Sequence, residues 1–143
     1  MATSKRSSKR SAPAQRLVRR PAPAAPRDPR LAEGIALFNH RQFFACHETL
    51  ERVWLSTTGR DRDFYKGLIQ AAVACYHWSR GNLGGAMSLF YSSSRYLKKY
   101  RPAHLGVDVE AFLRQYTELF GWLRRHHTRY DPRLVPTLSW VPP

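Results

Sequence analysis

Long hydrophobic runs are missing from this sequence. It has no run of about 18 apolar residues, the length that a membrane-spanning helix needs, and no secretory hydrophobic segment follows its first Lys and Arg residues. It has only two cysteines, Cys46 and Cys75, which form no C-x-x-C pair. Both fall in segments with helical patterning, so we expect no membrane span, two buried free thiols and a reducing, cytoplasmic location.

Acidic residues are also scarce, because 24 Lys and Arg residues face 10 Asp and Glu residues, for a net charge of +14. Residues 1–28 are rich in Arg, Pro and Ala, with almost no large apolar side chain, and predict a disordered basic arm. Such an arm suits a polyanion such as nucleic acid. It has no aromatic residue to stack on bases, which suits a solvated tail, and its composition also suits an organelle transit peptide.

No strand pattern competes with helical periodicity, so we predict an all-α fold, a compact bundle of about five helices. Their approximate ranges are 29–39, 42–56, 61–80, 83–100 and 108–126. A faint repeat at an offset of 40 relates the first pair of helices to the second pair and is typical of tetratricopeptide-like hairpins. The matched residues are Phe38, Phe43, Cys46 and Leu50 with Trp78, Leu83, Ala86 and Phe90.

Two such hairpins closed by a C-terminal helix give a helical domain over residues 29–127. The remaining Pro-rich extension, residues 128–143, is broken by prolines, so it cannot continue a helix. We expect Leu134, Leu138 and Trp140 to lay it over the bundle as an extended strap.

The helix at 61–80 is apolar nearly all round, which predicts a central helix. Its only polar face consists of Lys66, Gln70 and His77, spread over about 40° of the helical wheel. On the helix at 42–56, His47 shares a stripe with Phe43, Leu50 and Trp54, which predicts that His47 lies near the middle of the buried face. Antiparallel packing of the two helices would bring these groups together in a polar core cluster. The candidate residues are His47, Glu48, Glu51, Trp54, Lys66, Gln70 and His77.

Three interpretations of this cluster stay open. Glu51, His47 or His77 and Gln70 could form a structural hydrogen-bond network. His47 and Glu51, at i and i+4, could hold a divalent metal ion together with His77, although the second histidine of a zinc-protease motif is missing. The third interpretation is a pocket for a small polar ligand. Its walls would be the aromatic residues Phe43, Trp54, Phe64, Tyr65 and Tyr76.

Several ordered motifs resemble a known family. They are Gly34-Ile35-x-x-Phe38-Asn39, Phe43-Phe44-x-x-His47-Glu48-x-x-Glu51-x-x-Trp54, Arg62-x-Phe64-Tyr65-x-Gly67-Leu68-Ile69-Gln70, His77-x-x-Arg80-Gly81-Asn82-x-x-Gly85-Ala86 and Gly106-Val107-Asp108. Together they look like the bacterial and archaeal family called domain of unknown function 309. The resemblance implies packed helical hairpins in a small cytoplasmic protein with no established activity, so no catalytic residue is carried over. The family usually has Gly in place of Arg41 and Glu in place of Ala45.

These observations favour a non-enzymatic binding or scaffold module with a polar cluster in its core. One alternative is a metal-dependent, hydrolase-like enzyme that uses His47, Glu51 and His77. Another is a protein that associates with nucleic acid through its basic arm.

Overall fold

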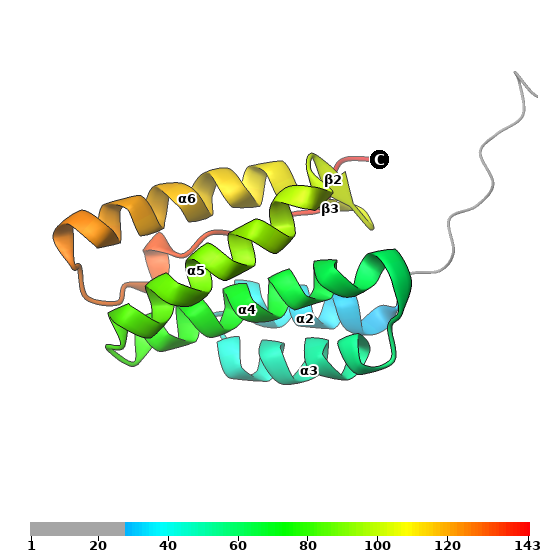
Figure 1. The fold of residues 1–143 in the computed structure, drawn as a ribbon, viewed down its shortest axis with the longest axis horizontal. Coiled ribbons are helices and arrows are strands. Elements are labelled where there is room, and N and C mark those ends of the chain that lie inside the picture. The colour runs from blue at the N-terminus through cyan, green and yellow to red at the C-terminus, as the bar shows by residue number, and fades with distance from the viewer. Residues whose placement is uncertain (1–27) are drawn as a thin grey trace, which may run out of the picture.

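The computed structural model describes residues 28–143, so the predicted arm lies outside the described residues except for Asp28. Within them the chain forms five α-helices joined by short connections and one small hairpin (Figure 1). The helices are α2 (Pro29–Asn39), α3 (Phe43–Leu55), α4 (Arg62–Ser79), α5 (Leu83–Leu97) and α6 (Val109–His126). The 3₁₀ turns are Gly59–Asp61, Lys98–Tyr100 and Pro132–Leu134, and the strands are β2 (Ala103–His104) and β3 (Val107–Asp108). The predicted all-helical bundle is confirmed. No helix in residues 28–143 has both the length and the apolar character to cross a bilayer.

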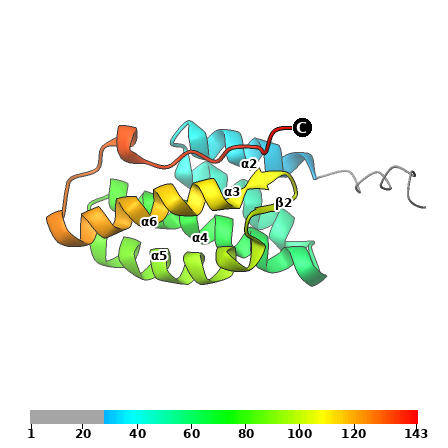
Figure 2. The same cartoon turned by 90° about the horizontal axis from the view of Figure 1, so that it is seen from above.

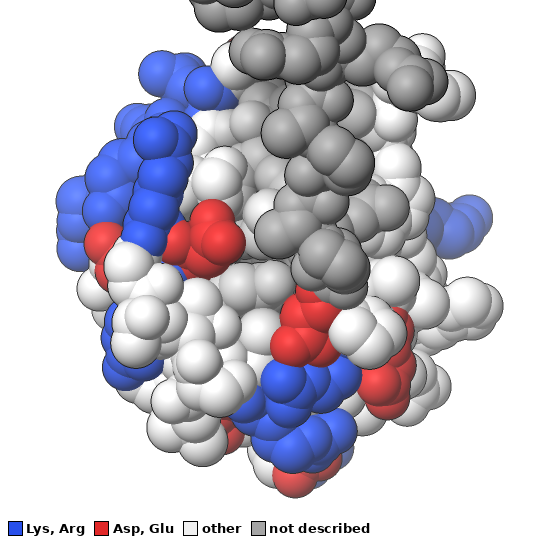
Figure 3. All heavy atoms as spheres, turned by 90° about the vertical axis from the view of Figure 1, so that its right-hand side faces the viewer, with Lys and Arg blue, Asp and Glu red and all other residues white. Residues whose placement is uncertain are grey.

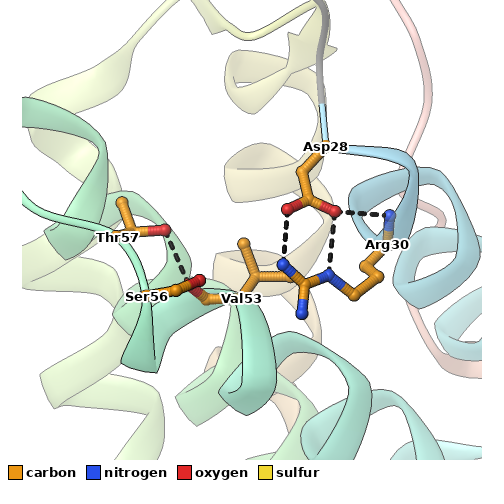
Figure 4. Close-up of polar contacts among 5 residues, drawn as sticks. All are labelled: Asp28, Arg30, Val53, Ser56 and Thr57. Carbon is orange, nitrogen blue, oxygen red and sulfur yellow. Dashed lines mark hydrogen bonds and ion pairs between the residues drawn. The ribbon is translucent and has the colours of Figure 1, made fainter.

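Side-chain hydrogen bonds mark where helices begin and end. The Asp28 carboxylate accepts a hydrogen bond from the backbone N–H of Arg30 at 2.9 Å and pairs with the Arg30 guanidinium (Figure 4), while Pro29 occupies the first turn. Asp28 therefore caps α2, although its sequence context places it in the arm. The Arg30 side chain lowers the pKa of Asp28. At the end of α3, the Val53 carbonyl accepts hydrogen bonds from the hydroxyls of Ser56 and Thr57 (Figure 4).

The two helical hairpins, α2–α3 and α4–α5, turn in the same way, as the repeat at an offset of 40 predicts. Arg41 has φ 64° in the first turn, and Gly81 has φ 78° at the matching position of the second. Glycine adopts this left-handed conformation readily, whereas an arginine does so at a cost. The two turns also share their backbone hydrogen bonds. The matched bonds are Gln42 N to Leu37 O and Asn82 N to His77 O, both 2.8 Å.

Helix α4 lies between α3 and α5 (Figure 1), which confirms it as the central helix. It approaches α5 closely at Gly67, where an added Cβ would come within 2.7 Å of Leu97 Cδ2. Helix α6 closes the bundle, because Phe112 packs against Phe38 of α2 and Phe120 stacks on Phe90 of α5. Between these two contacts the Tyr116 hydroxyl lies 2.8 Å from Ser93 Oγ, so the most buried tyrosine has a hydrogen-bond partner.

The hairpin formed by β2 and β3 is absent from the sequence-based expectation. Each strand has two residues, which is too short for alternating hydrophobicity to be recognised. The turn between them uses Leu105 and Gly106 with positive φ. His104 Nε2 lies 2.7 Å from Asp61 Oδ1 and its ring packs on Phe64, so the hairpin is fastened to the start of α4.

The C-terminal segment, residues 128–143, runs back along α6 toward the hairpin (Figures 1 and 2). It adds a β-bridge between Val107 and Trp140. Its inward residues are Val135 and Leu138, which are buried, whereas Leu134 and Trp140 are exposed. The expected strap is therefore present. Leu138 is buried and Trp140 fastens the strap through its bridge to Val107, whereas the prediction for Leu134 is wrong. Leu134 ends a 3₁₀ turn, and the buried positions begin one residue later.

Two side chains at the α2–α3 turn hold this strap. The Asn39 amide donates to the Leu138 carbonyl at 2.8 Å and accepts from its N–H at 2.9 Å. The Arg41 guanidinium donates to the carbonyls of Pro132, Val135 and Pro136 at 2.9–3.2 Å. Arg41 therefore contributes contacts that a glycine at this position could not make, and these contacts offset the cost of its positive φ.

Replacing Asn39 tests whether the strap stabilises the bundle. Asn39→Ala removes both hydrogen bonds to Leu138, so we expect a loss of about 1–3 kcal/mol in the free energy of unfolding. Urea denaturation followed by circular dichroism measures it. The matched control is Arg133→Ala, because Arg133 lies on the strap but pairs with Asp131 at the surface, where the change should be much smaller. Equal effects of the two substitutions would contradict a stabilising strap.

Candidate functional site

None of the seven predicted cluster residues lies in the core. His47, Trp54, Lys66, Gln70 and His77 are partly buried, and Glu48 and Glu51 are exposed. The expectation of a polar cluster in the core is therefore wrong: these residues lie on an open surface over α3 and α4.

The correction comes from how α3 is turned. Its buried residues are Phe43, Cys46, Thr49, Leu50 and Val53. Because α3 packs against both α2 and α4, its buried face is rotated toward Cys46 and Val53, away from the predicted stripe. His47 and Trp54 therefore lie at the margin of this face. Of the aromatic residues proposed as pocket walls, Phe43, Phe64 and Tyr65 belong to the core.

Trp54 lies against two cations of α4. The Arg62 guanidinium carbon is 3.9 Å from the centroid of the Trp54 ring, and Lys66 Nζ is 4.5 Å from it. Arg62 also donates to the carbonyls of Trp54 and Thr57 at 2.9 and 3.0 Å. These cation–π contacts and hydrogen bonds fix one end of the surface.

Aromatic contacts fix the other end. The ring of Phe44 lies 5.5 Å from that of His47 and 5.6 Å from that of Tyr76, measured between centroids. With Trp54 beside Lys66 and Phe44 beside Tyr76, the antiparallel register places Gln70 opposite the helical turn from His47 to Glu51. Phe44 is the member of this surface that the sequence pattern did not single out. The available signal was a large aromatic residue on the outward side of α3.

The pairing inside this surface is incomplete. His47 Nε2 lies 3.5 Å from Glu51 Oε1, with the two side chains 25% and 48% exposed, which makes a weak ion pair at most. His47 Nδ1 and Gln70 Oε1 are both buried atoms with no hydrogen-bond partner within residues 28–143. A buried polar atom without a partner costs about 1–3 kcal/mol. We name His47, Glu51, Trp54, Lys66 and Gln70 the polar strip.

His77 does not join His47 and Glu51. Its Nδ1 lies 3.4 Å from the side-chain amide of Asn82, at the far end of α4. Within the described part of the chain, no group of three or more His, Cys, Asp or Glu side chains is placed to hold a metal ion. The structure therefore does not bring the three predicted metal ligands together, and a bound divalent metal stays a prediction.

The two cysteines are free and buried, as expected. Burial raises the pKa of Cys46 to about 12 and raises that of Cys75 further. A thiolate is the nucleophilic form of cysteine, so neither thiol has the character of a nucleophile near neutral pH.

The segment that carries the polar strip matches a known protein family. Residues 31–89, from α2 into α5, match the family described as Domain of unknown function (DUF309). This part of the chain belongs to that family. The DUF309 segment contains all seven predicted residues, whereas α6 and the strap follow it.

The chain is also similar to an uncharacterized protein, YpuF, of Bacillus subtilis (strain 168). The two are 41% identical over 71 residues, which cover 48% of this chain and 41% of YpuF. The match thus spans less than half of the length of YpuF. No solved structure matches the chain.

The position of His47 at the margin of α3 can be tested by substitution. His47→Ala removes a partly exposed side chain whose Nδ1 has no partner, so we expect a cost below about 1 kcal/mol in the free energy of unfolding. Leu50→Ala, one turn along and fully buried, should cost about 2–5 kcal/mol. Chemical denaturation of the two variants makes the comparison. If His47→Ala lowered the free energy of unfolding as much as Leu50→Ala does, His47 would belong to the core after all.

Proposed function

We propose that this protein is a non-enzymatic binding module and that its ligand docks on the polar strip between α3 and α4. The observation that carries the proposal is the pair of buried atoms without partners, His47 Nδ1 and Gln70 Oε1. Both atoms belong to side chains that are only partly buried, so rotation of these side chains would turn the atoms toward a bound molecule.

The proposal also fixes the chemistry of the ligand. Gln70 Oε1 is an acceptor, and His47 Nδ1 accepts in one tautomer of the neutral ring. A ligand that offers hydrogen-bond donors, such as the N–H groups of a peptide segment, would satisfy both. The exposed ring of Phe44 and the half-buried ring of Tyr76 give an apolar part of that ligand a place to pack.

The ordered border of the polar strip supports a role in binding. Trp54 is held by Arg62 and Lys66, so one border is ordered before any ligand arrives. The non-enzymatic part of the proposal draws support from the chemistry of the site, because both thiols have raised pKa values and lie in the core.

One substitution separates a docking role from a structural role of Gln70. Gln70→Met keeps the length of the side chain and removes its unpaired acceptor. If the amide serves binding, the free energy of unfolding stays the same or rises, since an unsatisfied polar atom is lost. A fall of more than about 1 kcal/mol would assign Gln70 to the fold and contradict the proposal.

The binding itself is tested with benzamide, a ring that carries an N–H donor, in ¹H–¹⁵N NMR titrations of the full chain. We expect saturable shifts of amides in α3 and α4 that Gln70→Met abolishes. Arg114→Gln, an exposed change on α6, should leave the shifts intact. Methyl benzoate, which has the ring but no N–H donor, should bind more weakly. Equal shifts with both compounds, or none with benzamide, would overturn the proposed site.

A further inference from the structure

A cavity of about 300 Å³ lies between α5 and α6, away from the polar strip. Its walls carry three basic side chains: Arg95 from α5, Lys98 from the 3₁₀ turn that follows α5, and Arg124 from α6. None of the nine described residues that line it is acidic. The cavity thus combines a concave shape with an unbalanced positive charge.

Three cations of residues 28–143 pair with carboxylates: Arg30 with Asp28, Lys99 with Asp63, and Arg133 with Asp131. On the end of the molecule drawn in Figure 3, groups of Lys and Arg side chains have Asp and Glu side chains beside them. Lys99, next to Lys98 in the chain, pairs with Asp63 at 2.7 Å. Neither Arg95 nor Lys98 forms an ion pair with a carboxylate of residues 28–143. Their charge is therefore available to a ligand.

One cation of the cavity is oriented in advance. Arg124 Nη1 donates to the Tyr91 hydroxyl at 2.9 Å, which links the two helices across the cavity. The remaining N–H groups of the guanidinium keep the planar fork that suits an oxyanion. Because Tyr91 holds this side chain, less conformational freedom is lost when an anion binds.

A buried hydroxyl without a partner lies in the same wall. Ser94 is only 7% exposed, and its Oγ has no hydrogen-bond partner within the described chain. The preceding residue gives the contrast, since Ser93 Oγ donates to the Phe90 carbonyl and meets the Tyr116 hydroxyl. Helix geometry alone therefore does not explain the unpaired hydroxyl of Ser94. A ligand oxygen in the cavity would supply the missing partner.

The floor of the cavity is aromatic. Phe90 and Phe120 stack with centroids 4.7 Å apart and planes within 8°, and Tyr91 stands half-exposed at the rim. The Phe90 and Phe120 rings are themselves buried, so the aromatic surface that is open to a ligand is that of Tyr91. The size of the cavity is at the lower end for small-molecule sites, which suits one ring and one anionic group.

We propose that the α5–α6 cavity binds a small phosphate monoester that carries an apolar ring. Arg95, Lys98 and Arg124 neutralise the phosphate, the Ser94 hydroxyl donates to one of its oxygens, and the ring packs on the exposed ring of Tyr91. This site is separate from the polar strip, so either one can fail while the other stands.

Phenyl phosphate is the probe, titrated into the full chain and followed by calorimetry at constant ionic strength. We expect saturable binding that is stronger than that of inorganic phosphate. The double variant Arg95→Gln/Lys98→Gln, at exposed positions, should weaken it by at least about tenfold. Arg114→Gln on α6, outside the cavity, should leave it within about twofold. Equal weakening by both would show non-specific attraction to a basic protein and overturn the site, as would the absence of saturable binding.

Ser94→Ala gives an independent test. Loss of an unpaired buried hydroxyl should leave the melting temperature of the free protein unchanged or higher, while binding of phenyl phosphate falls severalfold. A lower melting temperature with unchanged binding would assign Ser94 to the fold and overturn its role in the site.

Discussion

The close packing of α4 against its neighbours is the constraint on which the rest of the structure depends. At Gly67 the backbone of α4 comes so near to α5 that an added Cβ would meet the fully buried Leu97. Ala71, Ala72 and Ala74 keep the neighbouring stretch of α4 narrow. Small residues let the helix axes approach, and the approach brings α3 and α5 near enough to α4 for α6 and the strap to close a single core.

The same packing determines where the molecule can bind a ligand. Since α4 is covered on most of its circumference, its polar residues Lys66, Gln70 and His77 lie on the side that faces solvent. On the other side of α5, the aromatic stack of Phe90 and Phe120 fills the contact with α6 but leaves a basic cavity above it. Both candidate sites thus lie in seams between helices, where a rigid core positions the groups.

Helix ranges, the central helix and the repeated hairpin turns could be predicted from the sequence, because they depend on local periodicity and on residues such as Gly81 and Asn82 at the turns. The prediction of a polar cluster in the core was wrong because a helical wheel does not show which face of a helix its neighbours cover. A helix between two partners buries a face set by both, and the direction toward Cys46 and away from His47 depends on where α2 lies. The α5–α6 cavity was missed because Ser94 and Arg124 are far apart in sequence and meet only through packing.

The most direct test of the central packing is the unfolding free energy of Gly67→Ala beside that of Gly84→Ala. Alanine favours helix over glycine by up to about 1 kcal/mol, and Gly84 has open space around it, so its variant should be unchanged or more stable. Gly67→Ala should instead lose about 1–3 kcal/mol, because the new methyl group must displace Leu97 or move α5. Equal or greater stability of the Gly67→Ala protein would contradict the close approach of α4 and α5.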